Sequence, residues 1–428
     1  MNSNGRATGW HFCQHFGEKI PIDDVSNVDI LSSLVFNEDG RFLAAGDNGG
    51  RVVIFQQEGI PDSREDEMVV VSGSKEKSEE YRFFSEFQSH EPEFDYLSST
   101  EIQERINVIR WIPSNSNSLS LLSTNDKTIK LWRLSEKHIG RIPCPLLDGA
   151  SHSQGKEQHP STDIVAQNKR VFGHAHSYNI HSLSCFNDGE TFISADDLRI
   201  NLWNLNVSNQ SFNILDIKPS NMSNLTEVIS SACCHPNHCS LFAYSTSRGV
   251  TTFSDLRVAS RSTPVRVFQD ESKTDPEIAD LVSTISSVHF TPGGRYFLTR
   301  DFLTVKVWDS FMEREPVQVF SVHESLRQQC VRMSDSDMFF DRFEIGISGD
   351  GRSFITGSYQ NTFHIMDRVT KSNITIEASR KSQLQLQGRT RRSMEVNVDN
   401  PEFGRSITQV AWHPLQDLVA LSSLNNLY

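Results

Sequence analysis

The sequence has little cysteine and no long apolar run. Its seven cysteines, an odd number, are scattered over 428 residues, a usage typical of reduced thiols rather than of a disulfide framework. No apolar stretch approaches the roughly 20 residues of a membrane-spanning helix, and residues 1–19 lack the apolar core of a secretory signal. These absences predict a cytoplasmic or nuclear protein that contacts no membrane.

Positive charge is also scarce, and familiar catalytic patterns are missing. The chain has 41 Lys and Arg against 54 Asp and Glu, a formal net charge of -13, which argues against nucleic acid as a partner and favours basic proteins. No Gly-rich phosphate loop, Ser-His-Asp set or pair of catalytic carboxylates stands out. We therefore expect a protein that is not an enzyme and needs no cofactor.

What the sequence does contain is a repeat. Residues 194–205, SADDLRINLWNL, give an acidic turn, a strand of alternating apolar residues and a closing Trp203. Residues 124–132 share this frame, because Asp126 and Asp197 each stand six residues before a Trp. Residues 301–308 repeat it with one residue of slippage. Weaker copies lie at residues 46–55, 247–255 and 357–367. One such unit cannot bury its own faces, so the repeats must pack together.

Seven such repeats predict an all-β fold, a seven-bladed WD40 β-propeller. Residues 9–428 form one domain after a disordered start at residues 1–8. Four polar stretches are expected to be long insertions between strands, namely residues 61–82, 135–170, 261–280 and 379–401. The third repeat is placed at residues 171–205, followed by a connector at 206–226, and the sixth repeat at Val322.

The last repeat, residues 407–428, is predicted to be an incomplete blade. Its sequence stops where a third strand is expected to begin, so this strand is predicted to be absent. The alternating segment Trp10–Phe16 is predicted to supply its outer strand.

Several segments resemble the 55-kilodalton B-type regulatory subunit of protein phosphatase 2A. The resemblance covers roughly residues 28–428, and two stretches that generic WD repeats do not share carry it best, SHEPEFDYL at residues 89–97 and DDLRINLWN at 196–204. It implies a non-catalytic subunit that binds a HEAT-repeat scaffold and a metal-dependent Ser/Thr phosphatase subunit. In that assembly it selects the phosphoprotein substrate.

The turns between second and third strands predict an acidic recognition surface. In a propeller these turns gather on one face, and here they carry Asp47, Asp126, Asp196, Asp197 and Asp301, which would attract Lys- and Arg-rich segments. The alternative is that Asp in a tight turn binds its own backbone. We assign this alternative more weight at Asp197 than at Asp196, because a second adjacent acid adds nothing that the turn requires.

The resemblance implies further substrate-binding residues on this face. Tyr178, Asp197 and Leu225 match positions that the family uses for substrates. Asn48 and Asn179 depart from the family, which usually has Lys and His there. We therefore predict substrate binding by Tyr178, Asp196, Asp197 and Leu225.

A second candidate surface combines aromatic and acidic residues at positions 83–104. His90, Glu91, Glu93 and Glu104 are predicted to contact a partner, since a polar segment bent by Pro92 is difficult to explain as packing. The aromatic residues of this stretch, Phe84, Phe87 and Phe94, can equally be core. By resemblance, residues 135–170 occupy the place of an arm that reaches the scaffold.

Two remaining motifs favour a simple structural explanation. Cys233–Cys239 holds three Cys and two His, the residue types of a zinc site, but its ligands lie too close together to form a tetrahedron, so we predict no metal. Arg389, Arg391 and Arg392 fit a solvated loop better than a localisation signal. A generic WD40 adaptor, such as a substrate receptor of a ubiquitin ligase, remains the alternative function.

Overall fold

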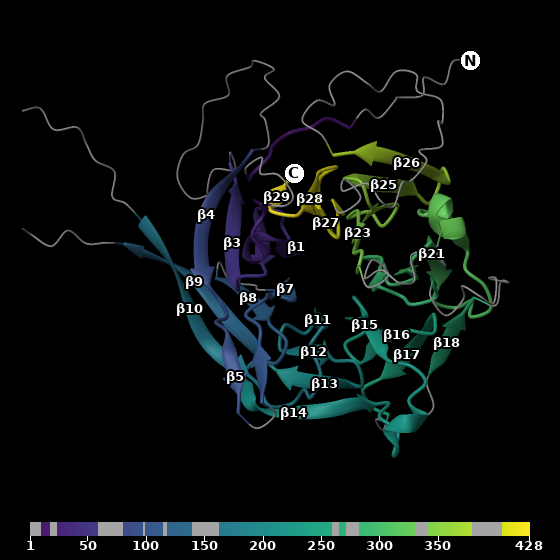
Figure 1. Cartoon of the computed structure of the whole chain (residues 1–428), viewed down its shortest axis with the longest axis horizontal. Helices are drawn as coiled ribbons and strands as arrows, with labels where there is room; N and C mark the ends of the chain where they lie inside the picture. The colour runs from purple at the N-terminus through teal and green to yellow at the C-terminus, as the bar shows by residue number, and fades with distance from the viewer. Residues whose placement is uncertain are drawn as a thin grey trace, which may run out of the picture.

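The computed structural model describes residues 10–17, 24–58, 80–96, 99–113, 118–138, 162–258, 265–270, 282–329, 341–378 and 405–428. Over these ranges six four-stranded sheets and one three-stranded sheet lie radially around one axis, as Figure 1 shows. Among the described residues, the 3-10 helix η2 (Asn27–Asp29) precedes β1, while η3 (Met222–Asn224) and η4 (Glu324–Gln329) lie in connections between sheets. The prediction of an all-β, seven-bladed propeller is confirmed.

Each sheet is an antiparallel meander that begins near the axis and ends at the rim. The first three sheets are β1 (Leu31–Phe36), β2 (Phe42–Asp47), β3 (Arg51–Gln57) and β4 (Tyr81–Gln88); β7 (Val108–Trp111), β8 (Leu119–Thr124), β9 (Ile129–His138) and β10 (Thr162–Phe172); and β11 (Ser182–Cys185), β12 (Thr191–Ala195), β13 (Arg199–Asn204) and β14 (Val207–Asp216). A separate hairpin pairs β5 (Glu93–Asp95) with β6 (Thr100–Ile102).

The other four sheets follow the same order. They are β15 (Ile229–Cys234), β16 (Leu241–Thr246), β17 (Val250–Asp255) and β18 (Arg266–Gln269); β19 (Ser287–Phe290), β20 (Tyr296–Arg300), β21 (Thr304–Asp309) and β22 (Gln318–Ser321); β23 (Ile345–Ile347), β24 (Ser353–Gly357), β25 (Thr362–Asp367) and β26 (Ser372–Glu377); and β27 (Gln409–Trp412), β28 (Val419–Ser423) and β29 (Asn426–Leu427).

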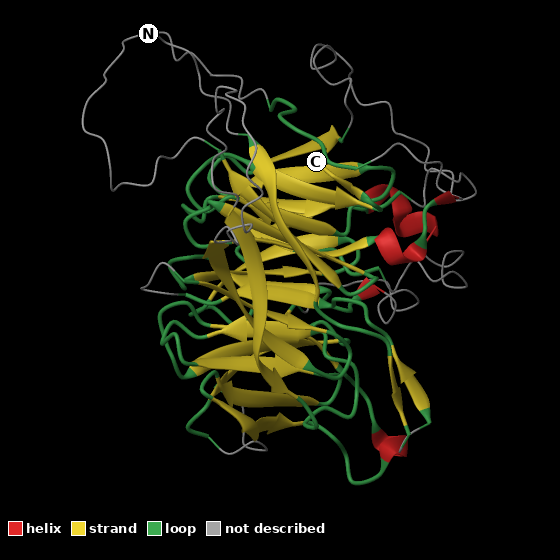
Figure 2. Ribbon diagram, turned by 90° about the vertical axis from the view of Figure 1, so that its left-hand side faces the viewer, coloured by secondary structure: helices red, strands yellow, loops and turns green. Residues whose placement is uncertain are grey.

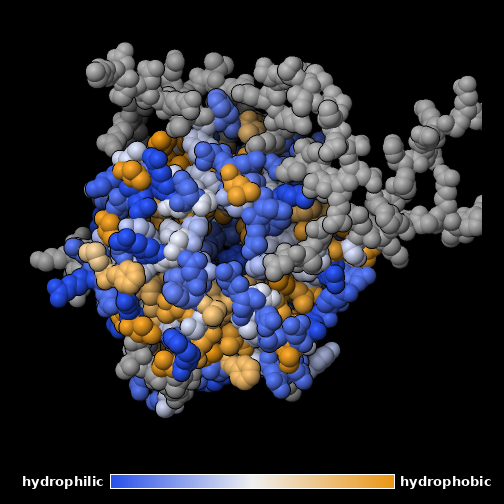
Figure 3. Space-filling view, turned by 180° about the vertical axis from the view of Figure 1, so that it is seen from behind, coloured by the Kyte–Doolittle hydropathy of each residue, from blue (hydrophilic) through white to orange (hydrophobic). Residues whose placement is uncertain are grey.

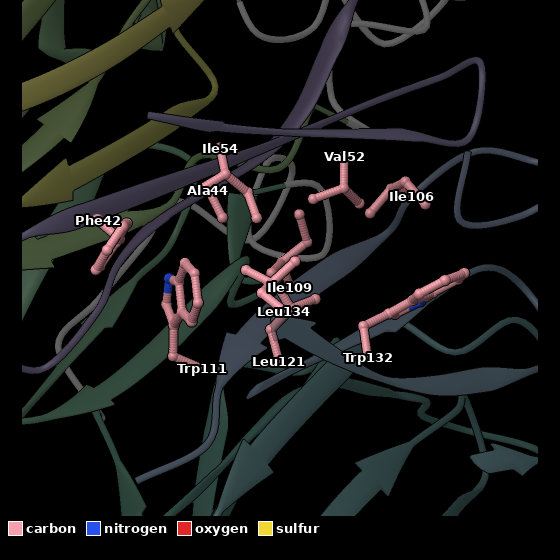
Figure 4. Close-up of a cluster of buried hydrophobic side chains, with 10 residues drawn as sticks. All are labelled: Phe42, Ala44, Val52, Ile54, Ile106, Ile109, Trp111, Leu121, Trp132 and Leu134. Atoms are coloured by element: carbon pink, nitrogen blue, oxygen red, sulfur yellow. The ribbon is translucent and has the colours of Figure 1, made fainter. Parts of the chain in front are cut away.

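The hydrophobic core is divided among the interfaces between neighbouring sheets. Figure 4 shows the cluster between the first two sheets, where Ile54 of β3 meets Ile109 of β7 and Trp111 of β7 approaches Phe42 of β2. A comparable cluster fills each of the other six interfaces, including the one that joins the last sheet to the first. Trp132, Trp203 and Trp308, at equivalent strand positions, are 8%, 2% and 2% exposed. Each interface therefore depends on residues from two sheets, as expected of a repeat unit that cannot bury its own faces.

The last sheet closes the ring with a shorter third strand than the others have. The prediction that this strand is absent was wrong: β29 pairs Leu427 with Ser422 of β28. The predicted outer position of residues 10–16 is confirmed at one bridge, where Phe16 and Leu427 exchange backbone hydrogen bonds of 2.9 and 3.0 Å. In the described residues β29 has two residues, whereas the third strands of the other sheets have at least six.

Several predicted boundaries were wrong because outer strands had been assigned to loops. Residues 135–138 and 162–170 belong to the long hairpin of β9 and β10, so that Val171 lies in the last strand of the second sheet instead of opening the third. The expected connector at 206–226 contains β14, and the insertions at 61–82 and 261–280 overlap β4 and β18. The sixth sheet begins at Ile345 and not at Val322. The predicted insertion at 379–401 and the start at residues 1–8 lie outside the described residues.

Candidate functional site

One face of the disc carries the turns between second and third strands and the connections between sheets, and we call it the connector face. Figure 2 shows helices gathered on this side, with the small β5–β6 hairpin projecting beside them. The four predicted substrate residues and the four predicted partner residues all lie in connections or turns of this face. The opposite face, in Figure 3, is hollowed at its centre and is hydrophilic around the hollow.

Most of the turn acids on the connector face are used inside the protein. The carboxylate of Asp47 accepts hydrogen bonds from the backbone N–H and the Nε of Arg51, and Asp301 lies 3.3 Å from the Nζ of Lys306. Asp301 also accepts from the backbone N–H groups of Leu303 and Thr304. A fully acidic surface is therefore not what these turns present.

Asp196 is a structural residue, and our preference for it as a surface recognition residue was wrong. It is fully buried, and its Oδ1 accepts from the backbone N–H groups of Leu198 and Arg199 at 2.8 and 2.7 Å. Asn125 and Asp301 make equivalent bonds in their own turns. All three stand seven residues before a Trp. The turn therefore requires a side-chain acceptor at this position, and the repeat at residues 301–308 has the same spacing to its Trp as the other two, without the predicted one-residue shift.

A chain of hydrogen bonds connects Asp196 to the core. Its Oδ2 lies 2.9 Å from His176 Nδ1, His176 Nε2 lies 2.6 Å from Ser194 Oγ, and Trp203 Nε1 donates to that same oxygen at 2.8 Å. Burial by itself would raise the pKa of Asp196, but the hydrogen bonds from His176 and the turn backbone outweigh burial and lower it. The chain fastens the connection before β11 to the turn after β12.

Asp197, the neighbouring residue, is half-buried, as are the turn acids Asp126 and Asp301. Burial raises its pKa, while the positive charges of Arg342 and Lys127 act in the opposite direction. Arg342 comes from the connection between the fifth and sixth sheets and donates to Ser230 O of β15. Asp197 is thus a half-buried carboxylate within the field of cations from two other sheets.

Tyr178 and Leu225 lie in the connections on either side of Asp197. Tyr178 is 37% exposed, and its segment is held on the second sheet where Ile180 N donates to Asp126 O at 2.9 Å. Leu225 is half-buried and ends η3, and four residues later Ile229 N donates to Asp197 O at 2.8 Å. The structure therefore places an aromatic, an acidic and an aliphatic residue on one face, in the connection before β11, the β12–β13 turn and the connection before β15.

The partner segment at residues 83–104 divides into an anchored and an exposed part. Phe84 and Phe87 of β4 pack against the first core cluster. Phe94 and Tyr96 of the β5–β6 hairpin are 47% and 84% exposed, and their rings form a T-shaped pair 5.1 Å apart. Glu91 and Glu93 are exposed beside them, and Glu104 is half-buried. The sequence alone did not distinguish the aromatic residues that pack in the core from those that lie on the surface.

His90 does not belong to the exposed part, so its assignment as a partner contact was wrong. It is 1% exposed, and burial together with the charge of Lys130 lowers its pKa to about 3. Its neighbour Ser89 bonds Ser123 Oγ at 2.7 Å and accepts from Trp132 Nε1 at 3.0 Å. Gly50, at φ +80°, is required here because a Cβ would collide with the backbone oxygen of His90. The base of the hairpin is therefore fixed to both the first and the second sheet.

The Cys- and His-rich segment at 233–239 serves packing. Cys233 and Cys234 are buried in different inter-sheet clusters, and His235 Nε2 lies 3.2 Å from Gly294 O. Burial raises the pKa of Cys233 to about 12, so its thiolate is disfavoured. Across the described ranges, no group of three or more Cys, His, Asp or Glu side chains is arranged to hold a metal ion. No helix in the described part of the chain is long and apolar enough to span a membrane.

Comparison with known proteins agrees with this geometry. A sequence model of the family described as WD domain, G-beta repeat matches residues 167–204. This range includes β11, β12 and β13 and the hydrogen-bonded side chains of His176, Ser194, Asp196 and Trp203. The chain is a seven-bladed β-propeller that contains a WD repeat. The crystal structure of Chaetomium thermophilum Raptor resembles it with a TM-score of 0.55 and 11% sequence identity over 93% of this chain and 28% of that chain. This propeller thus spans little more than a quarter of that larger protein, and the likeness concerns the fold.

Proposed function

We propose that this propeller is a non-catalytic regulatory subunit of a heterotrimeric Ser/Thr protein phosphatase of the 2A type. In this proposal it binds a HEAT-repeat scaffold and a catalytic subunit, and it recruits basic phosphoproteins through the connector face. The observation that best supports this proposal is the β5–β6 hairpin. Its first strand lies within the SHEPEFDYL segment, and it exposes the aromatic pair of Phe94 and Tyr96 on a base fixed to two sheets.

The hairpin has the composition of a protein-binding surface. Aromatic side chains dominate the binding energy of many interfaces, especially when they are held rigidly before binding. Phe94 and Tyr96 contribute nothing to the described core clusters, so their exposure is not a by-product of blade packing. The exposed Glu91 and Glu93 add negative charge beside them. We assign this hairpin to assembly with the phosphatase subunits.

The long β9–β10 hairpin, whose strands extend toward the face opposite the connector face, also supports the proposal. Its strands pair over residues 129–138 and 162–172, longer than any other pair of third and fourth strands in the described sheets. It stands where the resembling family has a scaffold-binding arm. Arg133, Gln167, Asn168 and Lys169 are exposed along it. We assign this hairpin to the scaffold contact.

Substrate recruitment is assigned to Tyr178, Asp197 and Leu225. An approaching Lys or Arg can replace the cations that act on Asp197, while the two apolar side chains provide area to bury. Such electrostatic complementarity would raise the association rate and the specificity more than the affinity. Hydrolysis of the phosphate would take place on the catalytic subunit.

Co-purification from cells tests the assembly. Tagged parent chain should bring down both the scaffold and the phosphatase, and the double variant F94A/Y96A should retain less than a tenth of the phosphatase. The matched control is F212A, since Phe212 is 60% exposed on the rim strand β14 and lies outside both hairpins. If the parent brings down neither subunit, the proposal is wrong and a WD40 adaptor in another complex, such as a ubiquitin ligase, takes its place.

A further inference from the structure

One of the seven tyrosines of this chain is far more accessible than the others. All seven lie in the described ranges. Tyr96 is 84% exposed, whereas Tyr178 is 37% exposed and the other five are half-buried or buried. Tyr96 directly follows β5 in the hairpin that projects from the disc in Figure 2. A second enzyme can therefore reach its phenolic oxygen without unfolding the propeller.

The segment that leads to Tyr96 is accessible as well. Residues 91–94 are all exposed, and Asp95 is half-buried. Over the described residues β5 pairs with β6 alone, so that its other edge carries no strand. An extended segment with one open edge can be bound along its backbone by another protein.

Negative charge precedes Tyr96 at alternate positions. Glu91, Glu93 and Asp95 stand five, three and one residues before it. Such a row of acids attracts a binding groove lined by Lys or Arg and helps to fix the register of the bound segment. The five residues before Tyr178, Gly-His-Ala-His-Ser, include no acid. An enzyme with a basic groove should therefore select Tyr96 over Tyr178 by charge as well as by exposure.

A phosphate on Tyr96 would change the surface that the hairpin offers to a partner. The ring of Tyr96 forms a T-shaped pair with that of Phe94, 5.1 Å away. Glu101 pairs with Phe94 across the hairpin, so it lies on the same face, because side chains alternate along a strand. A phosphate carries a charge of about −1.5 to −2 at neutral pH. It would repel Glu101 and would lose its hydration when the aromatic pair is buried, and both effects oppose binding.

We propose that Tyr96 is a phosphorylation site for a protein tyrosine kinase with a basic substrate groove, and that its phosphorylation releases the hairpin from the phosphatase subunits. The second part rests on the proposed function, whereas the first does not. Tyr96 Oη attacks the γ-phosphorus of ATP bound to the kinase, and the bond from this phosphorus to the bridging oxygen of ADP breaks. The phenolic proton passes to a carboxylate of the kinase. Hydrolysis of the ester by a tyrosine phosphatase restores Tyr96 and yields inorganic phosphate.

Site mapping on the full chain tests the modification. The chain is incubated with MgATP and the catalytic domain of a tyrosine kinase that phosphorylates a Glu–Tyr copolymer, and mass spectrometry measures the rate at each tyrosine. Tyr96 should be labelled at least tenfold faster than Tyr178, and Y96F should lose this labelling. E91Q/E93Q changes two exposed side chains and should slow the labelling of Tyr96 at least fivefold. Labelling of Tyr96 no faster than that of Tyr178, or unchanged in E91Q/E93Q, would overturn the proposal.

Assembly with purified scaffold and catalytic subunits tests the regulation. The phosphorylated chain should bind them at least tenfold more weakly than the unphosphorylated chain, and treatment with a tyrosine phosphatase should restore binding. Y96F carried through the same kinase reaction is the matched control and should keep its binding, because it retains the ring but lacks the acceptor oxygen. Equal binding of the phosphorylated and unphosphorylated chains would overturn the regulatory role. Failure of the unphosphorylated chain to bind would overturn the proposed function and the regulatory role with it, while labelling at Tyr96 would still establish the modification site.

Discussion

His176 Nδ1 lies 2.9 Å from Asp196 Oδ2, and both side chains are 1% exposed. The pair joins a connection between sheets to a turn within the third sheet, so the segment that carries Tyr178 is held at the same place as the turn that carries Asp197. Asp196 therefore has a structural role, and the proposed recognition role is assigned to its neighbour Asp197.

The two acids should respond differently to truncation. D196A removes one partner of a buried hydrogen-bonded pair and leaves turn N–H groups without an acceptor, so we expect a loss of about 3 kcal/mol in the free energy of unfolding. D197A removes a half-buried carboxylate that has no such role and should cost less than about 1 kcal/mol. Urea unfolding of the two variants measures both values. Equal losses would contradict the assignment of the turn to Asp196.

Trp203 should separate packing from hydrogen bonding. W203A opens a cavity in the cluster between the second and third sheets and should cost about 3–5 kcal/mol. W203F keeps an aromatic ring but loses the hydrogen bond to Ser194 Oγ. Its free energy of unfolding should therefore fall by less than that of W203A, and about 1 kcal/mol of the fall should come from the lost hydrogen bond. Thermal and urea melts measure the pair. An unchanged melting curve for W203A would contradict the repeat register.

Stability should fall as the pH is lowered from 6.5 toward 4. Burial lowers the pKa of His90 to about 3 and that of His364 to about 4, so the unfolded chain, with an ordinary His pKa near 6.5, binds protons in this range that the folded chain does not. Each of the two groups should contribute about 1.4 kcal/mol per pH unit to the slope.

Replacement of one histidine isolates its part of this slope. H364Q should reduce the slope by the contribution of one proton, about 1.4 kcal/mol per pH unit. Urea unfolding at closely spaced pH values measures this slope. The depressed pKa of Asp196 acts only below its ordinary value of 3.8 and so lies outside this range. A slope equal to that of the parent would show that His364 also takes up a proton in the folded state.

Charge reversal at Asp197 tests recognition. D197K should lower the rate at which the assembled phosphatase dephosphorylates a basic phosphoprotein, and it should weaken the salt dependence of that rate, because exposed charge contacts act mainly on association. Assembly with the scaffold should be unchanged. S211K, on the exposed rim strand β14, serves as the control for added positive charge. A D197K rate and salt response equal to the parent's would remove Asp197 from the substrate site.

The inner strands could be predicted from the sequence and the rim strands could not. The inner and middle strands are buried on both faces, as at β2 and β15, and this gives apolar runs and closing Trp residues that are easily recognised. β14 is exposed along most of its length and contains polar residues on both faces, so its sequence looks like a connector. Backbone pairing with β13 keeps it in the sheet.

The candidate site was predicted in part for a related reason. Asp196 and Asp197 are the same amino acid in adjacent positions, and only the direction of each side chain separates the buried carboxylate from the accessible one. The signal that could have separated them was the spacing to Trp, since Asn125, Asp196 and Asp301 share one position. His90 was misassigned because its burial depends on the first and second sheets meeting at Gly50, a contact between distant parts of the chain.

The backbone bridge between Phe16 and Leu427 is the mechanically weak point of the ring. Two backbone hydrogen bonds there, with one more from Leu31 N to Leu424 O, hold the last sheet to residues from the beginning of the described chain. Tension applied between residues 10 and 428 loads this short clasp before it reaches the longer strand pairs of the other sheets. A molecule stretched at these points should rupture first at the clasp and then unravel blade by blade, so that its force–extension trace shows one small initial peak before a regular series.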